Sequence, residues 1–445
     1  MKRSRLSFLI GAASSLLFCG FASAQDAPTS FKFSFAPGAA PAGFTQVAPD
    51  ATYTKTSGFG FDLGSKPQPA AAGVTGAKPF YFSVAVPEGN YKVTVVLGDP
   101  SAESTTTVKA EQRRLMLERI HTDAGKTETR SFTVNIRTPK ISTGGEVGID
   151  PGEVGALDWD EKLTLEFSDA HPALDSMEID KIDCPTIYVL GDSTVTDQAR
   201  EPGGSWAQSL PRWFTSQVAV ANHAESGETL RAFRRPAERR WDKVLSLLKP
   251  GDYVFMQFGT NDSKNHGPNN IYADEDFSQT YAEANTLYKS LLVQYAAETK
   301  AKGAIPVIVS PMGRRNMQNG KSTGAIGEYP KAAGDAAKEA NCPFIDLSAL
   351  SIQFYEALGP DLVGKAFNDG THPNSYGGYM LSRCIVEGIK ADKLDLANYL
   401  VDDAGTFDPS HPVPMPADFK LPPDPSTPRA GGRARGATRP APAAN

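Results

Sequence analysis

The sequence predicts an α/β domain that is built on a five-stranded parallel sheet and preceded by an all-β sandwich. Three observations predict this architecture. Apolar and polar residues alternate with period two before residue 183, whereas apolar strands alternate with helical segments after it. The apolar strands run into loops rich in Gly, Asp, Asn and Ser. The length of 445 residues leaves room for two or three domains.

The first 24 residues are predicted to be a secretory signal that is cleaved off. A basic start, Lys2 to Arg5, precedes an apolar stretch from Leu6 to Phe18, and Ala22-Ser23-Ala24 provides a small-residue cleavage site. The apolar stretch is too short to span a bilayer. We therefore expect a secreted or periplasmic protein that does not insert into a membrane.

Composition argues against several classes of partner and scaffold. The net charge of -6 makes nucleic acid an unsuitable partner. The cysteines that follow the signal, Cys184, Cys342 and Cys384, cannot all pair within one chain and lack the spacing of a zinc site. The sequence still allows one disulfide bridge between two of them. We expect a monomer that needs no metal and no cofactor.

Residues 25–183 are predicted to form the β-sandwich. Apolar side chains alternate with mostly polar ones in residues 91–97, 132–137 and 163–167, and Gly, Pro and Asp turns separate such stretches. This pattern is typical of antiparallel strands with one apolar face, and two such sheets bury their apolar faces against each other.

Residues 184–402 are predicted to form the α/β domain. Uninterrupted apolar runs indicate strands that are covered on both faces, as in a parallel sheet. These strands are expected at residues 187–190, 218–221, 253–258, 305–309 and 344–347. Helix-period stretches lie between and after them, at 277–300 and 376–392. Right-handed crossovers would give a flavodoxin-like, three-layer domain.

Residues 403–445 are rich in Pro, Ala, Gly and Arg and contain few large apolar residues. Such a segment cannot bury enough surface to offset its ordering entropy. We expect an extended strap followed by a disordered tail. The arginines of the tail could touch an anionic surface, although solvation alone also accounts for them.

The first strand of the α/β domain runs directly into Gly191-Asp192-Ser193-Thr194. Gly191 allows a sharp turn, which places Ser193 just past the carboxyl end of the strand, where ligands bind in open α/β sheets. Ser193 is therefore a candidate nucleophile. A serine that only caps the next helix would show the same local pattern.

Loops that follow other strands supply the partners that a serine nucleophile requires. His372 can accept the hydroxyl proton near neutral pH, and Asp369 can hold the other imidazole nitrogen. The backbone amides of Ser193 and Gly227 and the side-chain amide of Asn261 can donate to an oxyanion. Each residue alone also fits a turn or a cap. All of these loops should meet at one edge of a parallel sheet, which favours the chemical interpretation.

These motifs resemble those of the SGNH (GDSL-type) hydrolase superfamily. The matching residues are Gly191-Asp192-Ser193, Gly227, Gly259-x-Asn261-Asp262 and Asp369-x-x-His372. The chain is also similar to the rhamnogalacturonan acetylesterase branch at Thr194, at Trp206-Ala207-Gln208 and at Arg314-Arg315, although Ser205 stands where that branch often has Gly. The all-β region resembles the galactose-binding-like domain of bacterial members.

The resemblance implies a metal-independent esterase that removes acetyl groups from rhamnogalacturonan, an acetylated pectic polysaccharide, through an acyl-enzyme. Ser193, Asp369 and His372 would be catalytic, and Ser193, Gly227 and Asn261 would form the oxyanion hole. Arg314 and Arg315 follow the fourth strand, and guanidinium groups suit galacturonate carboxylates. We therefore expect them to bind substrate. A further arginine cluster at 231–240 fits either the same role or a solvated helix face.

Four alternatives stay open at this point. The acetylated glycan could be another one, such as xylan. A lipid acyl esterase would need an apolar acyl channel, but the loops carry Lys and Asn instead. A non-catalytic carbohydrate-binding protein would not need the complete motif set. Asp262 with His266 could form a different acid–base pair.

Overall fold

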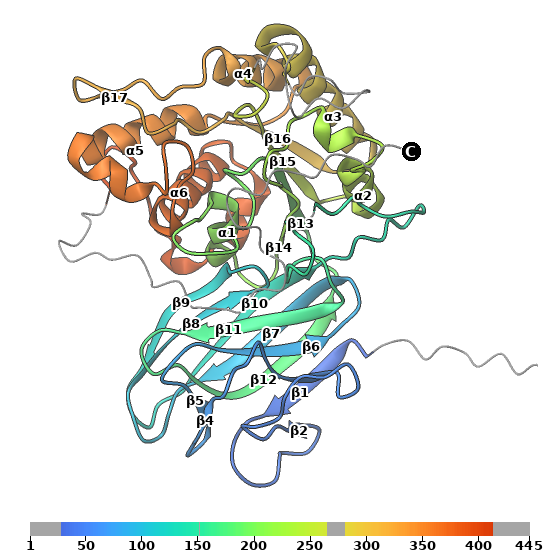
Figure 1. The fold of residues 1–445 in the computed structure, drawn as a ribbon, viewed down its shortest axis with the longest axis vertical. Coiled ribbons are helices and arrows are strands. Elements are labelled where there is room, and N and C mark those ends of the chain that lie inside the picture. The colour runs from blue at the N-terminus through green and yellow to red at the C-terminus, as the bar shows by residue number, and fades with distance from the viewer. Residues whose placement is uncertain (1–27, 151, 265–280, 413–445) are drawn as a thin grey trace, which may run out of the picture.

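The computed structural model describes residues 28–150, 152–264 and 281–412 (Figure 1). The predicted signal, His266 and most of the predicted tail lie outside these ranges. Within them, no helix is both long enough and apolar enough to cross a membrane. Cys184, Cys342 and Cys384 are all free thiols.

The N-terminal region folds into two facing, mainly antiparallel sheets (Figure 1). The first sheet has the order β10-β7-β12-β1-β2, with β5 and β4 beside β12, and the second has the order β3-β6-β11-β8-β9. The strands are β1 (Ser30–Ser34), β2 (Thr45–Gln46), β3 (Phe59–Asp62), β4 (Gln68–Ala70), β5 (Gly73–Thr75), β6 (Phe80–Ala85), β7 (Gly89–Leu97), β8 (Ser104–Ala110), β9 (Arg114–Thr122), β10 (Glu128–Ile136), β11 (Lys162–Ser168) and β12 (Ala173–Ile182).

Alternating residues of these strands form one core between the two sheets. In β7, Tyr91, Val93, Val95 and Leu97 are all 0% exposed, as their period-two spacing predicts. Phenylalanines from both sheets, such as Phe33 and Phe82, meet edge to face at 5.2 Å between ring centroids.

The second region contains the predicted five-stranded parallel sheet, so the fold class is confirmed. Its order is β14-β13-β15-β16-β19, and every neighbouring pair is parallel. The strands are β13 (Thr186–Gly191), β14 (Ala219–Asn222), β15 (Tyr253–Gln257), β16 (Ile305–Val309) and β19 (Phe344–Ile345). The short hairpin of β17 (Met317–Gln318) and β18 (Lys321–Ser322) follows β16.

Helices cover both faces of this sheet. The helices are α1 (Trp206–Ser209), α2 (Arg240–Leu247), α3 (Lys289–Ala301), α4 (Tyr329–Ala340), α5 (Leu347–Leu362) and α6 (Ser375–Ala391). Shorter helical turns span Leu210–Trp213, Ala232–Arg234, Ala284–Tyr288, Val363–Ala366, Asp395–Tyr399 and Asp402–Ala404.

The alternation along β13 explains why two helical layers are needed. Ile187 and Val189 lie in a core with α1, α5 and α6, whereas Tyr188 and Leu190 lie in a second core with α2, α3 and α4. Because successive side chains of a strand point to opposite faces, an unbroken apolar run must be covered twice.

Candidate active site

Ser193 lies in a tight turn at the carboxyl end of β13. A Cβ at Gly191 would lie 2.6 Å from Val195 Cγ2 and 2.7 Å from the Gln257 carbonyl oxygen, so the turn admits only glycine there. Asp192 Oδ1 accepts hydrogen bonds from the Thr194 amide at 2.9 Å and the Thr194 hydroxyl at 2.8 Å. The Gly-Asp-Ser-Thr sequence thus fixes the turn that presents Ser193.

The structure brings the three predicted catalytic residues into contact. Ser193 Oγ lies 2.8 Å from His372 Nε2, and His372 Nδ1 lies 2.8 Å from Asp369 Oδ2. At these distances the hydroxyl of Ser193, the imidazole of His372 and the carboxylate of Asp369 form one hydrogen-bonded chain, here called the relay. The arrangement can move the serine proton onto the imidazole while the carboxylate holds the opposite ring nitrogen.

Asp369 is fixed by its own loop. Its Oδ1 accepts hydrogen bonds from the amides of Thr371 at 2.7 Å and His372 at 2.8 Å. Partial burial acts to raise the pKa of this carboxyl, but these bonds and the His372 side chain lower it to about 2. Asn374 has a different role, because its side chain caps α6 by accepting from the Gly377 amide at 3.0 Å.

The predicted oxyanion donors lie beside the relay. Gly227 follows β14 with φ +91, a left-handed conformation that favours glycine. Asn261 follows β15 and is 7% exposed; its Nδ2 donates to the Glu228 carbonyl oxygen at 3.1 Å. Within the described ranges, the backbone amides of Ser193 and Gly227 donate to no protein group. They can therefore donate to a substrate oxygen.

Asp262 joins the two loops that carry these donors. Its side chain is fully buried, with Oδ1 accepting from the Leu230 amide and Oδ2 from the Gly259 amide, each at 3.0 Å. Burial raises the pKa of this carboxyl to about 7. Because both oxygens accept from backbone amides, Asp262 holds the two loops together and is not placed as a member of an acid–base pair. His266, its partner in that alternative, lies outside the described residues.

Polar side chains and glycines line the pocket around the relay. The lining residues are Ser193, Gln198, Gly203, Ser226, Gly227, Asn261, Lys264, Asn368 and His372. None of these described residues has a side chain made of hydrocarbon alone. The pocket therefore suits a small acyl group and a polar alcohol better than a long apolar chain.

The sequence assigned no site role to five of these lining residues: Gln198, Gly203, Ser226, Lys264 and Asn368. Gln198 Nε2 donates to the Ser193 carbonyl oxygen at 2.7 Å, and Lys264 Nζ donates to Asn261 Oδ1 at 2.6 Å. Partial burial, helped by the charge of Arg314, lowers the pKa of Lys264. The one sequence signal for Lys264 as a pocket residue is its position in a motif loop, three residues after Asn261.

The arginines expected to bind substrate do not line this pocket. Arg314 is half-buried and donates to the Thr260 carbonyl oxygen at 3.4 Å, whereas Arg315 is exposed, with its backbone amide bonded to Gly370. In the 231–240 cluster, Arg234 pairs with Glu298 at 2.8 Å. Arg239 pairs with Asp242 at 3.0 Å, and Arg240 pairs with Glu153.

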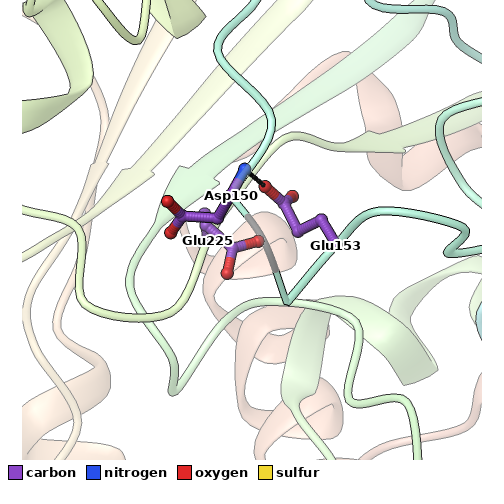
Figure 2. Close-up of side chains that lie close together, drawn as sticks. All are labelled: Asp150, Glu153 and Glu225. Atoms are coloured by element: carbon purple, nitrogen blue, oxygen red, sulfur yellow. Dashed lines mark hydrogen bonds between the residues drawn. The ribbon is translucent and has the colours of Figure 1, made fainter. Parts of the chain in front are cut away.

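Three carboxylates, here called the carboxylate cluster, could hold a cation. Figure 2 shows Asp150, Glu153 and Glu225, whose oxygens lie within 4.8 Å of one another. Burial and the neighbouring Glu153 raise the pKa of Glu225 well above its usual value. Arg240 is 1% exposed and pairs with Glu153, so a protein cation already balances part of the charge. The cluster lies next to the Gly227 loop rather than in the pocket.

Comparisons with known proteins agree with this geometry. Residues 189–378 match the model of the GDSL-like Lipase/Acylhydrolase family. Rhamnogalacturonan acetylesterase RhgT of Bacillus subtilis is 30% identical over 237 residues, which are 49% of this chain and 95% of that protein. A rhamnogalacturonan acetylesterase of Emericella nidulans is 27% identical, over 48% of this chain and 89% of its own. The uncharacterized esterase YxiM of Bacillus subtilis is 24% identical over 82% of this chain and 91% of its own.

Proposed function

Since the chain belongs to the GDSL-like lipase/acylhydrolase family, and is thus a carboxylic ester hydrolase, we propose that it is an exported serine esterase that deacetylates rhamnogalacturonan. The observation that carries this proposal is the relay from Ser193 through His372 to Asp369, with both contacts at 2.8 Å. It stands at the edge of a pocket whose lining is polar.

In the proposed first step, Ser193 Oγ attacks the carbonyl carbon of the acetyl ester while His372 Nε2 takes the hydroxyl proton. The negative charge that forms on the carbonyl oxygen is stabilised by the amides of Ser193 and Gly227 and by Asn261 Nδ2. The bond to the sugar oxygen then breaks, and His372 gives its proton to that oxygen. An acetyl-serine and a free sugar hydroxyl result.

In the second step, water attacks the acetyl-serine. His372 takes a proton from the water, the tetrahedral intermediate forms in the same oxyanion hole, and its collapse returns the proton to Ser193 and releases acetate. Asp369 holds His372 in the tautomer that leaves Nε2 free to accept a proton. Apart from the substrate and this water, both steps use groups of this chain.

Two observations support acetylated rhamnogalacturonan as the substrate. The relatives named rhamnogalacturonan acetylesterases match this chain over nearly their whole length. Lys264 also lines the pocket, and cationic side chains favour the galacturonate carboxylates of this polysaccharide. Acetylated xylan has a neutral backbone and gives the contrasting case.

Acetate release from acetylated rhamnogalacturonan and from acetylated xylan tests the proposal. We expect faster release from rhamnogalacturonan, and we expect Ser193→Ala to lower kcat by about three orders of magnitude or more, the usual scale for a nucleophile. The variant should fold, which its melting temperature checks. Near wild-type release by Ser193→Ala would refute the mechanism, and faster release from xylan would refute the substrate.

A further inference from the structure

The turn between β8 and β9, residues 111–113, reaches from the N-terminal sandwich to the active-site loops. Arg113 Nη1 donates to the carbonyl oxygens of Gln198 at 2.9 Å and Gly203 at 3.1 Å. Its Nη2 pairs with Glu201 and donates to Ser375 Oγ at 3.2 Å. One guanidinium group from the sandwich thus contacts four residues of the α/β domain.

Two of these residues form one wall of the catalytic pocket. Gln198 and Gly203 both line the pocket. Gln198 Nε2 also bonds the Ser193 carbonyl oxygen at 2.7 Å, and the Gly204 amide bonds the Pro373 carbonyl oxygen at 3.2 Å, next to His372. The wall held by Arg113 therefore runs from the nucleophile turn to the histidine loop.

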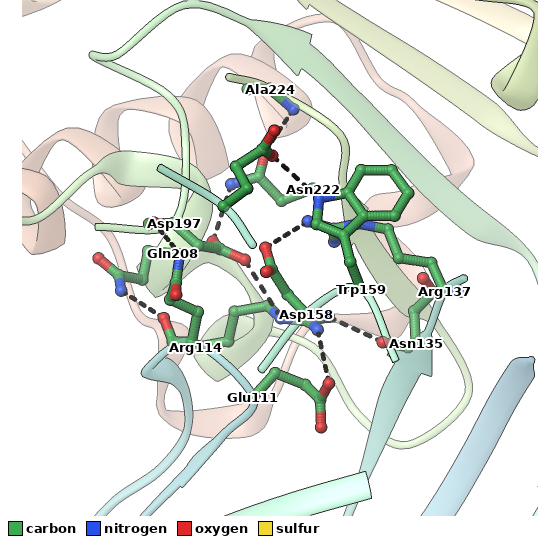
Figure 3. A network of polar contacts seen from close by, with 12 residues as sticks. Glu111, Arg114, Asn135, Arg137, Asp158, Trp159, Asp197, Gln208, Asn222 and Ala224 are labelled. Carbon is green, nitrogen blue, oxygen red and sulfur yellow. Dashed lines mark hydrogen bonds and ion pairs between the residues drawn. The ribbon is translucent and has the colours of Figure 1, made fainter. Parts of the chain in front are cut away.

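Neighbours of Arg113 hold the same segment. Gln112 Nε2 donates to the Asp197 carbonyl oxygen at 3.0 Å. Figure 3 shows Arg114, which is 0% exposed, directed at Asp197, with Nε 3.3 Å from Oδ2. The other carboxylate oxygen of Asp197 accepts from Asn222 Nδ2 at 2.8 Å, in the strand that leads to Gly227. The sandwich is thus connected to both the Ser193 and the Gly227 loops.

The burial of this contact shows that its geometry is demanding. The Arg113 side chain is 11% exposed and that of Glu201 is 3% exposed. Such a pair offsets its desolvation better when further hydrogen bonds are made, and the two Nη atoms also donate to two carbonyl oxygens and a hydroxyl. Nε of Arg113 has no hydrogen-bond partner among the described residues. Glu111 and Arg113 also have φ of 55 and 65, left-handed values that non-glycine residues keep only when their surroundings impose them.

We propose that Arg113 is a positioning residue for the esterase reaction, so that the sandwich helps catalysis by setting the pocket wall. Arg113 itself does not line the pocket; it acts through Gln198 and Gly203. The inference rests on the proposed function in taking Ser193 as the nucleophile. It assigns a role to a region that lies before the family match at residues 189–378.

Steady-state hydrolysis of 4-nitrophenyl acetate by Arg113→Met tests this role. We expect kcat/KM to fall by up to about 100-fold, the scale of a 1 Å misplacement of reacting groups, with most of the loss in kcat. Arg119→Met is the matched control, because Arg119 lies on β9, the strand that follows this turn, and is 65% exposed. Among the described residues, its side chain pairs with Asp169 alone. The kcat and KM of this control should equal those of the wild type.

A second variant separates positioning from stability. Arg113→Met/Glu201→Gln removes the carboxylate that the single substitution leaves unpaired, so its melting temperature should recover while its kcat stays low. Recovery of both quantities would overturn the inference, because the role would then be structural. Wild-type kcat and KM in folded Arg113→Met would overturn it as well.

Ser193→Ala, assayed alongside, distinguishes this inference from the proposed function. If Ser193→Ala is inactive and Arg113→Met is fully active, only the positioning role fails. If Ser193→Ala is active, the proposed mechanism fails and the positioning role fails with it.

Discussion

Replacing Asp369 by asparagine changes one contact of the relay and keeps the others. Oδ1 of the new side chain can still accept from the amides of Thr371 and His372, which lie 2.7 and 2.8 Å from Oδ1 in the native loop. The loop should therefore keep its shape. The second oxygen, 2.8 Å from His372 Nδ1, becomes an NH₂ group that can only donate.

The size of the effect follows from the tautomer that this NH₂ group selects. Facing a donor, His372 Nδ1 must accept, so the ring proton moves to Nε2. Nε2 is the atom that lies 2.8 Å from Ser193 Oγ and must accept its proton. The same change in a Ser-His-Asp triad lowers kcat about 10⁴-fold, which corresponds to about 5.4 kcal/mol in activation free energy.

The chain provides a matched control for this substitution. Asp408 Oδ2 lies 2.8 Å from His411 Nδ1 with the same sequence spacing, and Asp408 Oδ1 accepts from the Ser410 amide at 2.9 Å. This pair is exposed and does not line the pocket. Asp408→Asn should leave kcat for 4-nitrophenyl acetate unchanged. A folded Asp369→Asn enzyme within tenfold of the wild-type kcat would refute the tautomer argument.

Three further predictions concern pH, metals and substrate charge. Because the pKa of Asp369 is lowered to about 2, its carboxylate favours the folded state above about pH 4, and this contribution is lost as the pH falls through 2. Because Asp369 stays ionised down to about pH 3, its protonation should not add to the acid limb of the pH profile. A plot of log kcat/KM against pH should therefore have a slope of one on that limb, and a slope of two would reveal a second titrating group. Exhaustive chelation should leave acetate release unchanged, because the buried Arg240 already pairs with Glu153 of the carboxylate cluster. A loss of activity on chelation that added Ca²⁺ restores would contradict this. Lys264→Met should raise KM for acetylated rhamnogalacturonan and leave KM for 4-nitrophenyl acetate unchanged. Arg315→Ala, at an exposed residue outside the pocket lining, should change neither value. Equal losses on both substrates in Lys264→Met would show that Lys264 acts through Asn261 instead.

The sheet and the meeting of the motif loops could be predicted because both follow from local pattern and one topological rule. The apolar run before Gly191 predicts a doubly covered strand, and parallel strands end at one edge, so Ser193, Asn261 and His372 must approach one another. The order of the motifs along the chain then identifies the catalytic Asp-x-x-His pair. Asp-x-x-His occurs at 369 and again at 408, and only the first pair lies between the fifth strand and the helix-period stretch at 376–392.

What could not be predicted depends on contacts between distant segments. Arg113 is one of many arginines in an ordinary strand-turn pattern, and nothing nearby in the sequence indicates that its charge is buried against Glu201. Arg314 was expected at the pocket because it follows a strand of the same sheet. Its side chain donates to the Thr260 carbonyl oxygen instead, and Lys264 is the cationic residue that lines the pocket.

The carboxyl of Asp262 has a consequence for how the oxyanion hole is assembled. Because its two oxygens each hold an amide from a different loop, the segments bearing Gly227 and Asn261 are coupled and should shift together. Donors joined in this way keep their spacing before any substrate arrives, and the reaction then spends no free energy on bringing them together. Loss of this one side chain would act on two donors at once, although its oxygens accept from the amides of Leu230 and Gly259 and not from either donor.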